Sequence, residues 1–178
     1  MVTFFAVALA ATALNVAAAQ TPEAQPFPAN PPIAEPIDQP YPGTLSIKVD
    51  ATDLEHRILQ VEERIPVKAG ALTLLFPQWL PGQHAPNGRV DRMAGLTISC
   101  NGQPIPWRRD SANVYAFHLD IPQGVAAIDL KFQYLSALTS AQGRMFMSAD
   151  MLHIKWHDVV LYPAGYFARR IQIGRAHV

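Results

Sequence analysis

The sequence is short of cysteine, of net charge and of long apolar runs. Cys100 is the only cysteine among 178 residues, so no disulfide forms within the chain. The 14 basic and 14 acidic side chains cancel, and this balance gives no reason to expect a nucleic acid or an acidic membrane surface as a partner. The apolar stretch at residues 4–14 is too short to span a bilayer. What is left is a chain whose length fits one folded domain.

The first 43 residues have the composition of segments outside a folded domain. Residues 1–19 are predicted to be a secretory signal peptide, because small residues ending at Ala19 follow the apolar stretch. No Lys or Arg precedes that stretch, and a short amphipathic core helix is the alternative. Residues 20–43 hold eight of the 16 prolines and are predicted to be an extended linker. We therefore expect a periplasmic or secreted protein that is free of the membrane after signal cleavage.

From residue 44 to residue 172 the apolar residues alternate with polar ones, which is the period of β-strands. Alternating apolar positions recur along successive short segments: Leu45, Ile47, Val49; Leu59, Val61, Ile65; Leu72, Leu74, Phe76; Leu96, Ile98, Cys100; Tyr115, Phe117, Leu119; Ile128, Leu130, Phe132, Tyr134; and Leu152, Ile154, Trp156. Asn101-Gly102 is a strong hairpin signal. The pattern predicts an all-β fold, either a β-sandwich or a strongly curved double antiparallel sheet. About 130 residues are enough to bury a real core.

Two residues stand out against this pattern. Glu63 interrupts the apolar face of its predicted strand, and we expect it to lie at a bulge or to pair with Arg64 or Lys48. Cys100 shares a strand face with apolar neighbours, so we expect a buried and unreactive thiol.

Residues 76–82, with the sequence FPQWLPG, are predicted to form a tight turn after an apolar strand. Pro81 sets the backbone angle of the first central turn position, and Gly82 accepts the positive φ that a type II turn needs at the second. Trp79 is expected to anchor this corner as a large apolar side chain. These seven residues alone are compatible with a well-packed corner of any β domain.

A longer series of short motifs points to a particular protein family. The series runs, in order, through PQWLPG (77–82), HAP (84–86), AGL (94–96), NGQPIPW (101–107), VYAFH (114–118), FQYLS (132–136) and LYPAGY (161–166). In this order and spacing the chain closely resembles the N-terminal domain of the glycyl aminopeptidase family of zinc metallopeptidases, family sixty-one of the peptidase classification. The resemblance covers roughly residues 43–172.

The resemblance implies a zinc site that this sequence does not contain. Enzymes of this kind hold zinc with an H-E-x-x-H helix and a downstream Glu. The nearest equivalent here is His153 and His157, but Ile154 stands where the Glu would be. On the predicted strand their Cα atoms would be about 13 Å apart, too far for one ion without a sharp bend. We therefore expect no cofactor and no catalysis in this chain, and zinc in a missing catalytic domain.

The loop at residues 139–144 is the best candidate for contact with a substrate. The resemblance implies that the β-domain walls one side of the active-site cleft. By chain position Gln142 and Arg144 would face it, Gln142 accepting hydrogen bonds from the free amine of a peptide. A plain surface loop is the alternative. His56, His84 and His118 are scattered over different segments, so they suggest no Ser/His/Asp arrangement and are expected to be ordinary satisfied histidines.

The last six residues, 173–178, depart from the family pattern. Their sequence IGRAHV matches the translation of a common sequencing adapter, which also carries a stop at that point. We therefore expect natural sequence to end near Gln172 and the parent protein to continue into a zinc catalytic domain.

These observations predict the non-catalytic N-terminal β-domain of a secreted zinc aminopeptidase that removes small N-terminal residues. Its expected role is to scaffold and wall the cleft of the missing catalytic domain, which is its partner within the same polypeptide. The alternative is a stand-alone secreted β-sandwich that binds a peptide or a glycan.

Overall fold

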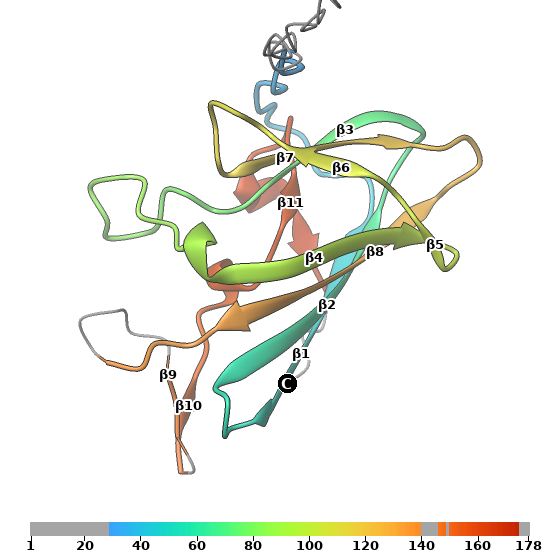
Figure 1. Ribbon diagram of the computed structural model, residues 1–178. Coiled ribbons are helices and arrows are strands. Elements are labelled where there is room, and N and C mark those ends of the chain that lie inside the picture. Colours follow the sequence, from blue (N-terminus) through green and yellow to red (C-terminus); the bar gives the residue numbers. More distant parts are fainter. Residues whose placement is uncertain (1–28, 140–145, 149, 175–178) are drawn as a thin grey trace, which may run out of the picture.

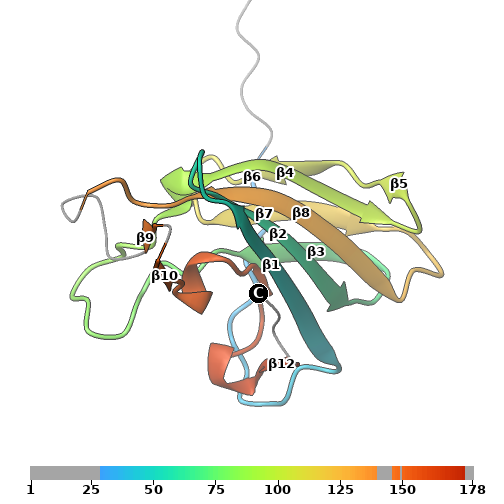
Figure 2. The same cartoon turned by 90° about the horizontal axis from the view of Figure 1, so that it is seen from below.

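The protein is an all-β sandwich of two stacked sheets, which confirms the fold class predicted from the alternating pattern (Figures 1 and 2). The computed structural model describes residues 29–139, 146–148 and 150–174. The strands are β1 (Thr44–Asp53), β2 (Ile58–Pro66), β3 (Gly70–Leu75), β4 (Met93–Cys100), β5 (Gln103–Pro104), β6 (Trp107–Arg109), β7 (Ala116–Ile121), β8 (Ala127–Leu135), β9 (Phe146–Met147), β10 (Leu152–His153), β11 (Tyr162–Pro163) and β12 (Gln172–Ile173). Within these described ranges the short 3-10 helices are η1 (Val90–Arg92), η3 (Trp156–Asp158) and η4 (Ala168–Arg170).

The larger sheet has six strands in the order β12-β1-β2-β8-β4-β5. Its long central strands are antiparallel, and β2 pairs with β8 without interruption from Ile58 opposite Leu135 to Pro66 opposite Ala127. The short strand β12 joins β1 in parallel. This sheet therefore connects the first strand of the fold to the last.

The smaller sheet has four antiparallel strands in the order β11-β3-β7-β6. Strands β9 and β10 form a separate two-stranded ribbon. Figure 1 shows this ribbon at the end of the sandwich where the turn between β1 and β2 also lies.

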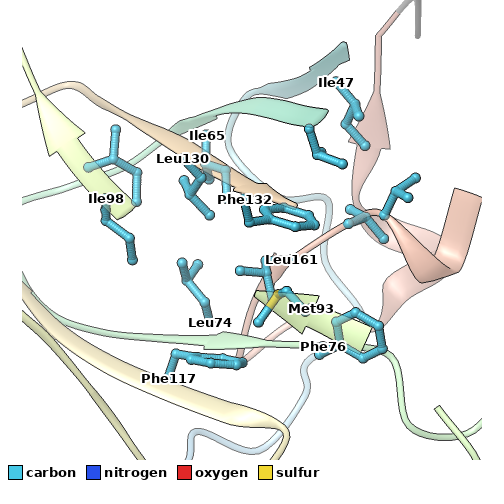
Figure 3. Close-up of a cluster of buried hydrophobic side chains, with 14 of the residues drawn as sticks. Ile47, Ile65, Leu74, Phe76, Met93, Ile98, Phe117, Leu130, Phe132 and Leu161 are labelled. Carbon is cyan, nitrogen blue, oxygen red and sulfur yellow. The ribbon is translucent and has the colours of Figure 1, made fainter. Parts of the chain in front are cut away.

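The core lies between the two sheets, because alternate side chains of each strand point inward. In β1 the exposed and buried positions alternate from Thr44 to Asp50, as the sequence predicts. Figure 3 shows Leu74 and Phe117 of the smaller sheet facing Leu130 and Phe132 of the larger one. Leu161, on the segment before β11, is fully buried between them.

The predicted hairpin at Asn101-Gly102 is present and joins β4 to β5, with Cys100 opposite Gln103. Both turn residues have positive φ, 48° at Asn101 and 78° at Gly102, as the favoured two-residue hairpin turn requires. Cys100 is buried, as predicted.

Part of the predicted linker packs against the sandwich. Residues 29–43, which we call the N-terminal strap, lie beside the smaller sheet (blue in Figure 1). The Ile37 and Tyr166 backbones form a parallel bridge, and Asp38 accepts a hydrogen bond of 2.6 Å from Arg170 Nε. The Tyr41 ring meets the Tyr166 ring edge-on, with 5.0 Å between their centroids. These residues therefore belong to the folded domain.

Two local predictions were wrong. The strand expected through Leu152, Ile154 and Trp156 ends at His153, and η3 follows from Trp156. Glu63 does not lie at a bulge, and its carboxyl pairs with neither Arg64 nor Lys48: Oε2 accepts from the Leu161 N–H and Oε1 has no partner among the described residues. Strand β2 pairs with β8 without interruption before and after Glu63. The carboxyl points into the core, and 2 % of the surface of this residue is exposed. The strand period thus holds at Glu63 even though its side chain is acidic.

Among the residues that the structure describes, no helix has the length and apolar character needed to cross a membrane.

Candidate functional site

The two residues predicted to line a substrate cleft, Gln142 and Arg144, lie outside the described residues. The loop that carries them joins β8 to the β9–β10 ribbon. Their role stays a prediction.

The turn at Pro81 and Gly82 forms as predicted, but Trp79 does not anchor it. Gly82 has a φ of 76°, and the Gln83 backbone N–H donates to the Leu80 carbonyl oxygen at 3.0 Å. The Trp79 side chain is 62 % exposed, so the corner is not held by its burial. The loop is closed by its backbone, since the Gly88 N–H donates to the Gln78 carbonyl oxygen at 3.0 Å.

Large apolar side chains are exposed at one end of the sandwich. This end carries the β1–β2 turn, the loop after β3, the segment after β8, the β9–β10 ribbon and η3 (Figures 1 and 2). The exposed apolar residues on these segments, which we call the exposed apolar end, are Leu54, Trp79, Leu135, Leu138, Met151, Leu152 and Trp156. Scattered single apolar residues are ordinary on a protein surface, but several at one end indicate a contact surface.

Charged groups lie at the same end. After the turn at Pro81 and Gly82, Arg89 Nη2 and Asp91 Oδ2 form an ion pair at 2.7 Å. Arg92 is buried, and so is Asp158 at the end of η3. Burial raises the pKa of Asp158, with nearby His157 and Lys155 acting in the opposite direction. One Asp158 oxygen, Oδ1, has no hydrogen-bond partner among the described residues.

A buried polar chain crosses the outer face of the smaller sheet. His118 of β7 lies opposite Thr73 of β3, and its Nδ1 is 2.9 Å from the Thr73 hydroxyl. Its Nε2 is 2.8 Å from Asp110 Oδ2. Both His118 and Asp110 are almost fully buried. This arrangement satisfies every polar atom of the imidazole, as expected for an ordinary structural histidine.

The Asp110 carboxylate is held in its charged form by several donors. The Asn113 and Ala112 backbone N–H groups donate to Oδ1 at 2.9 and 2.8 Å. The Asn113 N–H and His118, which bonds the other oxygen, lower the pKa of Asp110 to about 2. Asp110 is therefore ionised over the whole range in which proteins are normally handled.

Asn30 of the N-terminal strap completes this network. Its amide nitrogen donates to Asp110 Oδ1 at 2.7 Å and to the Ser111 hydroxyl at 2.9 Å. Its amide oxygen accepts from Arg108 Nη1 at 2.7 Å. The sequence does not reveal this group, because Asn30 is about eighty residues from its partners. The only local signal was Asp110 followed by small polar residues, which is typical of a turn held by an Asp side chain.

The residues present do not fit the zinc site that the resemblance implies. His153 ends strand β10 and His157 lies in η3, so the two histidines do not share a helix. His157 lies beside Asp158, with 3.8 Å between Nε2 and Oδ1. Among the described residues no group of three or more His, Cys, Asp or Glu side chains is placed to hold a metal ion. No chemical step through zinc can be built on this part of the chain.

Comparison with known proteins gives the family. Residues 46–176 match the model of the Peptidase M61 N-terminal domain, which is more than half of the chain. The chain belongs to this peptidase family. The matched range includes four of the six residues that we interpret as translated adapter, so the origin of the tail stays a prediction.

Solved structures give a distant similarity. The crystal structure of an aminopeptidase N family protein from Idiomarina loihiensis is similar, with 18% sequence identity and a TM-score of 0.45. The match covers 54% of this chain and 16% of that one, so the chain spans a small part of the length of that protein. No curated protein matches.

Proposed function

We propose that this chain is the non-catalytic β-domain of a secreted zinc aminopeptidase that removes small N-terminal residues. In this proposal the β-domain packs against a catalytic domain of the same polypeptide and forms one wall of its active-site cleft. The family match supports the peptidase assignment, since an N-terminal domain of a peptidase implies a catalytic partner domain. Zinc, the substrate preference and secretion follow from the resemblance and are part of the proposal.

The observation that carries the docking role is the exposed apolar end. Trp79, Leu138 and Met151 are each more than half exposed, on three different segments of that end. A monomeric domain rarely leaves several such side chains in water, whereas a domain that packs against a neighbour does. The loop of Gln142 and Arg144 joins two of the segments that carry this end, which is compatible with a place at the cleft.

The decisive experiment is an independent read of the gene across codon 172. We expect the frame to continue past Ile173 and to encode H-E-x-x-H on a predicted helix, with a Glu ligand further on. An authentic stop codon directly after Val178, with no catalytic domain downstream, would overturn the proposal. That result would favour the alternative, a stand-alone module that binds a peptide or a glycan.

The chain by itself offers a second test of the same proposal. Dialysed against a weak chelator, it is expected to retain no stoichiometric zinc and to leave alanyl and glycyl anilides uncleaved. Tight zinc, or hydrolysis that a chelator abolishes, would contradict the assignment of catalysis to another domain.

A further inference from the structure

Arg108 of β6 is a half-buried cation without an acidic partner. Its Nη1 donates to the Asn30 amide oxygen, which uses one of the five N–H donors of a guanidinium. The nearest acid along the chain, Asp110, is occupied by Asn30, His118 and two backbone N–H groups. Within the described residues no ion pair includes Arg108. Because partial burial of an unpaired charge is costly, such a group favours an anionic ligand.

The Arg108 side chain lines a pocket of about 580 Å³ between the strap and the smaller sheet. Pro31 and Pro32 of the strap form one wall, and Ala71 of β3 is part of the floor. The pocket also contains Asp120, which the structure leaves exposed and without a salt bridge among the described residues.

Strand register places the two charges close together. Arg108 lies directly opposite His118, so Asp120, two residues further along β7, is its diagonal neighbour on the same face. Diagonal neighbours on a sheet have Cα atoms roughly 7–8 Å apart. No ion pair joins the Arg108 guanidinium to the Asp120 carboxylate among the described residues, so each is available to one charge of a molecule whose ammonium and carboxylate share one carbon atom.

We propose that this pocket binds a free α-amino acid as its zwitterion. The ligand carboxylate lies against the Arg108 guanidinium, whose paired N–H groups match two carboxylate oxygens. The ligand ammonium donates to the Asp120 carboxylate, and its side chain lies against Pro31, Pro32 and Ala71. Asn30 acts as a positioning residue, because its hydrogen bond fixes the guanidinium and ties the strap that forms the wall. The site is separate from the exposed apolar end and does not depend on the proposed function.

The test is a titration of the full, isotope-labelled chain with L-alanine and L-leucine, in which the backbone N–H shifts are followed by NMR. We expect saturable shifts at Ala71, Arg108 and Asp120. Arg108→Gln and Asp120→Asn are each expected to weaken binding by about tenfold, the usual loss for a hydrogen bond between charged groups. Arg109→Gln is the matched control, because Arg109 points to the Phe117 ring on the other face of β6. It is expected to bind as the wild type does.

Analogues separate the two charges of the ligand. Acetate carries the carboxylate alone and methylamine the ammonium alone, so each is expected to bind at least about tenfold more weakly than alanine. Equal binding of acetate and alanine would overturn the zwitterion assignment. Absence of saturable shifts up to about 100 mM alanine, or unchanged binding in Asp120→Asn, would overturn the site itself. If Arg108→Gln does not fold, Asp120→Asn and the analogues still decide the question, since Asp120 is exposed.

Discussion

Replacing Glu63 by Gln is expected to stabilise the protein at neutral pH. The carboxyl of Glu63 lies in the core, where Oε2 accepts the Leu161 backbone N–H at 3.0 Å and Oε1 has no partner among the described residues. Loss of water raises the pKa of Glu63 well above 4.5, and the single hydrogen bond from Leu161 only partly offsets this effect. Gln keeps the shape and the acceptor for Leu161 but carries no charge.

The size of the effect follows from proton linkage. A carboxyl whose pKa is raised by folding holds a proton that the unfolded chain releases, so stability is complete below pH 4.5 and falls as the pH rises toward the folded-state pKa. Each pH unit in that range costs about 1.4 kcal/mol. From pH 4.5 to pH 7 the ceiling is therefore about 3.5 kcal/mol, which is the largest gain that removal of this charge can give at pH 7.

Urea unfolding of both proteins at pH 4.5, 5.5, 6.5 and 7.5 measures this difference. We expect the free energies of unfolding to be similar at pH 4.5 and to diverge steadily above it, with the Gln variant more stable. Glu62→Gln is the control, because Glu62 is exposed, pairs with Lys131 at 2.8 Å and has a lowered pKa. It is expected to change stability by less than about 1 kcal/mol. A pH-independent difference between wild type and Glu63→Gln would refute the assignment of a buried, protonated carboxyl.

Four further predictions concern other parts of the fold. Asn30→Ala removes the side-chain hydrogen bonds that tie the start of the strap to Arg108, Asp110 and Ser111, each worth about 1 kcal/mol. Limited proteolysis should therefore cut residues 29–43 several times faster, whereas Asn87→Ala, at an exposed loop, should not change the rate. Acid should also speed cleavage of the strap in this proteolysis assay. The stability that ionised Asp110 contributes is present above pH 3.8 and is lost as the pH falls toward 2. Unchanged protection of the strap at pH 2 would contradict this. The double variant Trp156→Ser with Met151→Ser should bind less of a hydrophobic dye and should self-associate less in size-exclusion chromatography. Its melting temperature should not fall, because both side chains are exposed. Undiminished dye binding would place the apolar surface elsewhere. Gly88→Ala should lower the free energy of unfolding by about 1–3 kcal/mol, because the added Cβ would lie 1.9 Å from the Pro77 carbonyl oxygen. Gly124→Ala is the control: its Cβ meets no atom within 4 Å, so it should cost only the strain of a positive φ, about 1 kcal/mol, in thermal unfolding.

The sandwich was predictable from the sequence because each strand alternates in a simple period. Leu45, Ile47 and Val49 are all buried, and the Asn101-Gly102 hairpin forms where its residues predict it. Glu63 shows that the period was a better guide than the chemistry of one side chain. Glu63 was expected at a bulge or in a pair with Arg64 or Lys48, yet the regular pairing of β2 with β8 places its side chain on the core face.

The candidate sites were much less predictable, because they join residues far apart in the chain. Asn30, Arg108 and Asp110 meet only after the strap folds across the smaller sheet. Trp79 was expected to be buried on the basis of its size, but its loop is closed by backbone hydrogen bonds and leaves the ring outside. Sequence spacing also failed at His153 and His157, where a strand ends and a 3-10 turn begins between the two rings.

The contacts of the strap have a consequence for folding during synthesis. Asp38 bonds to Arg170, 132 residues later, and Thr44 of β1 pairs with Gln172 of β12. These contacts of the first residues of the domain can therefore form only after almost the whole domain has left the ribosome. Pairings of such long range make folding slow, so the strap and the outer edge of β1 are the parts that a chaperone or a protease would meet first.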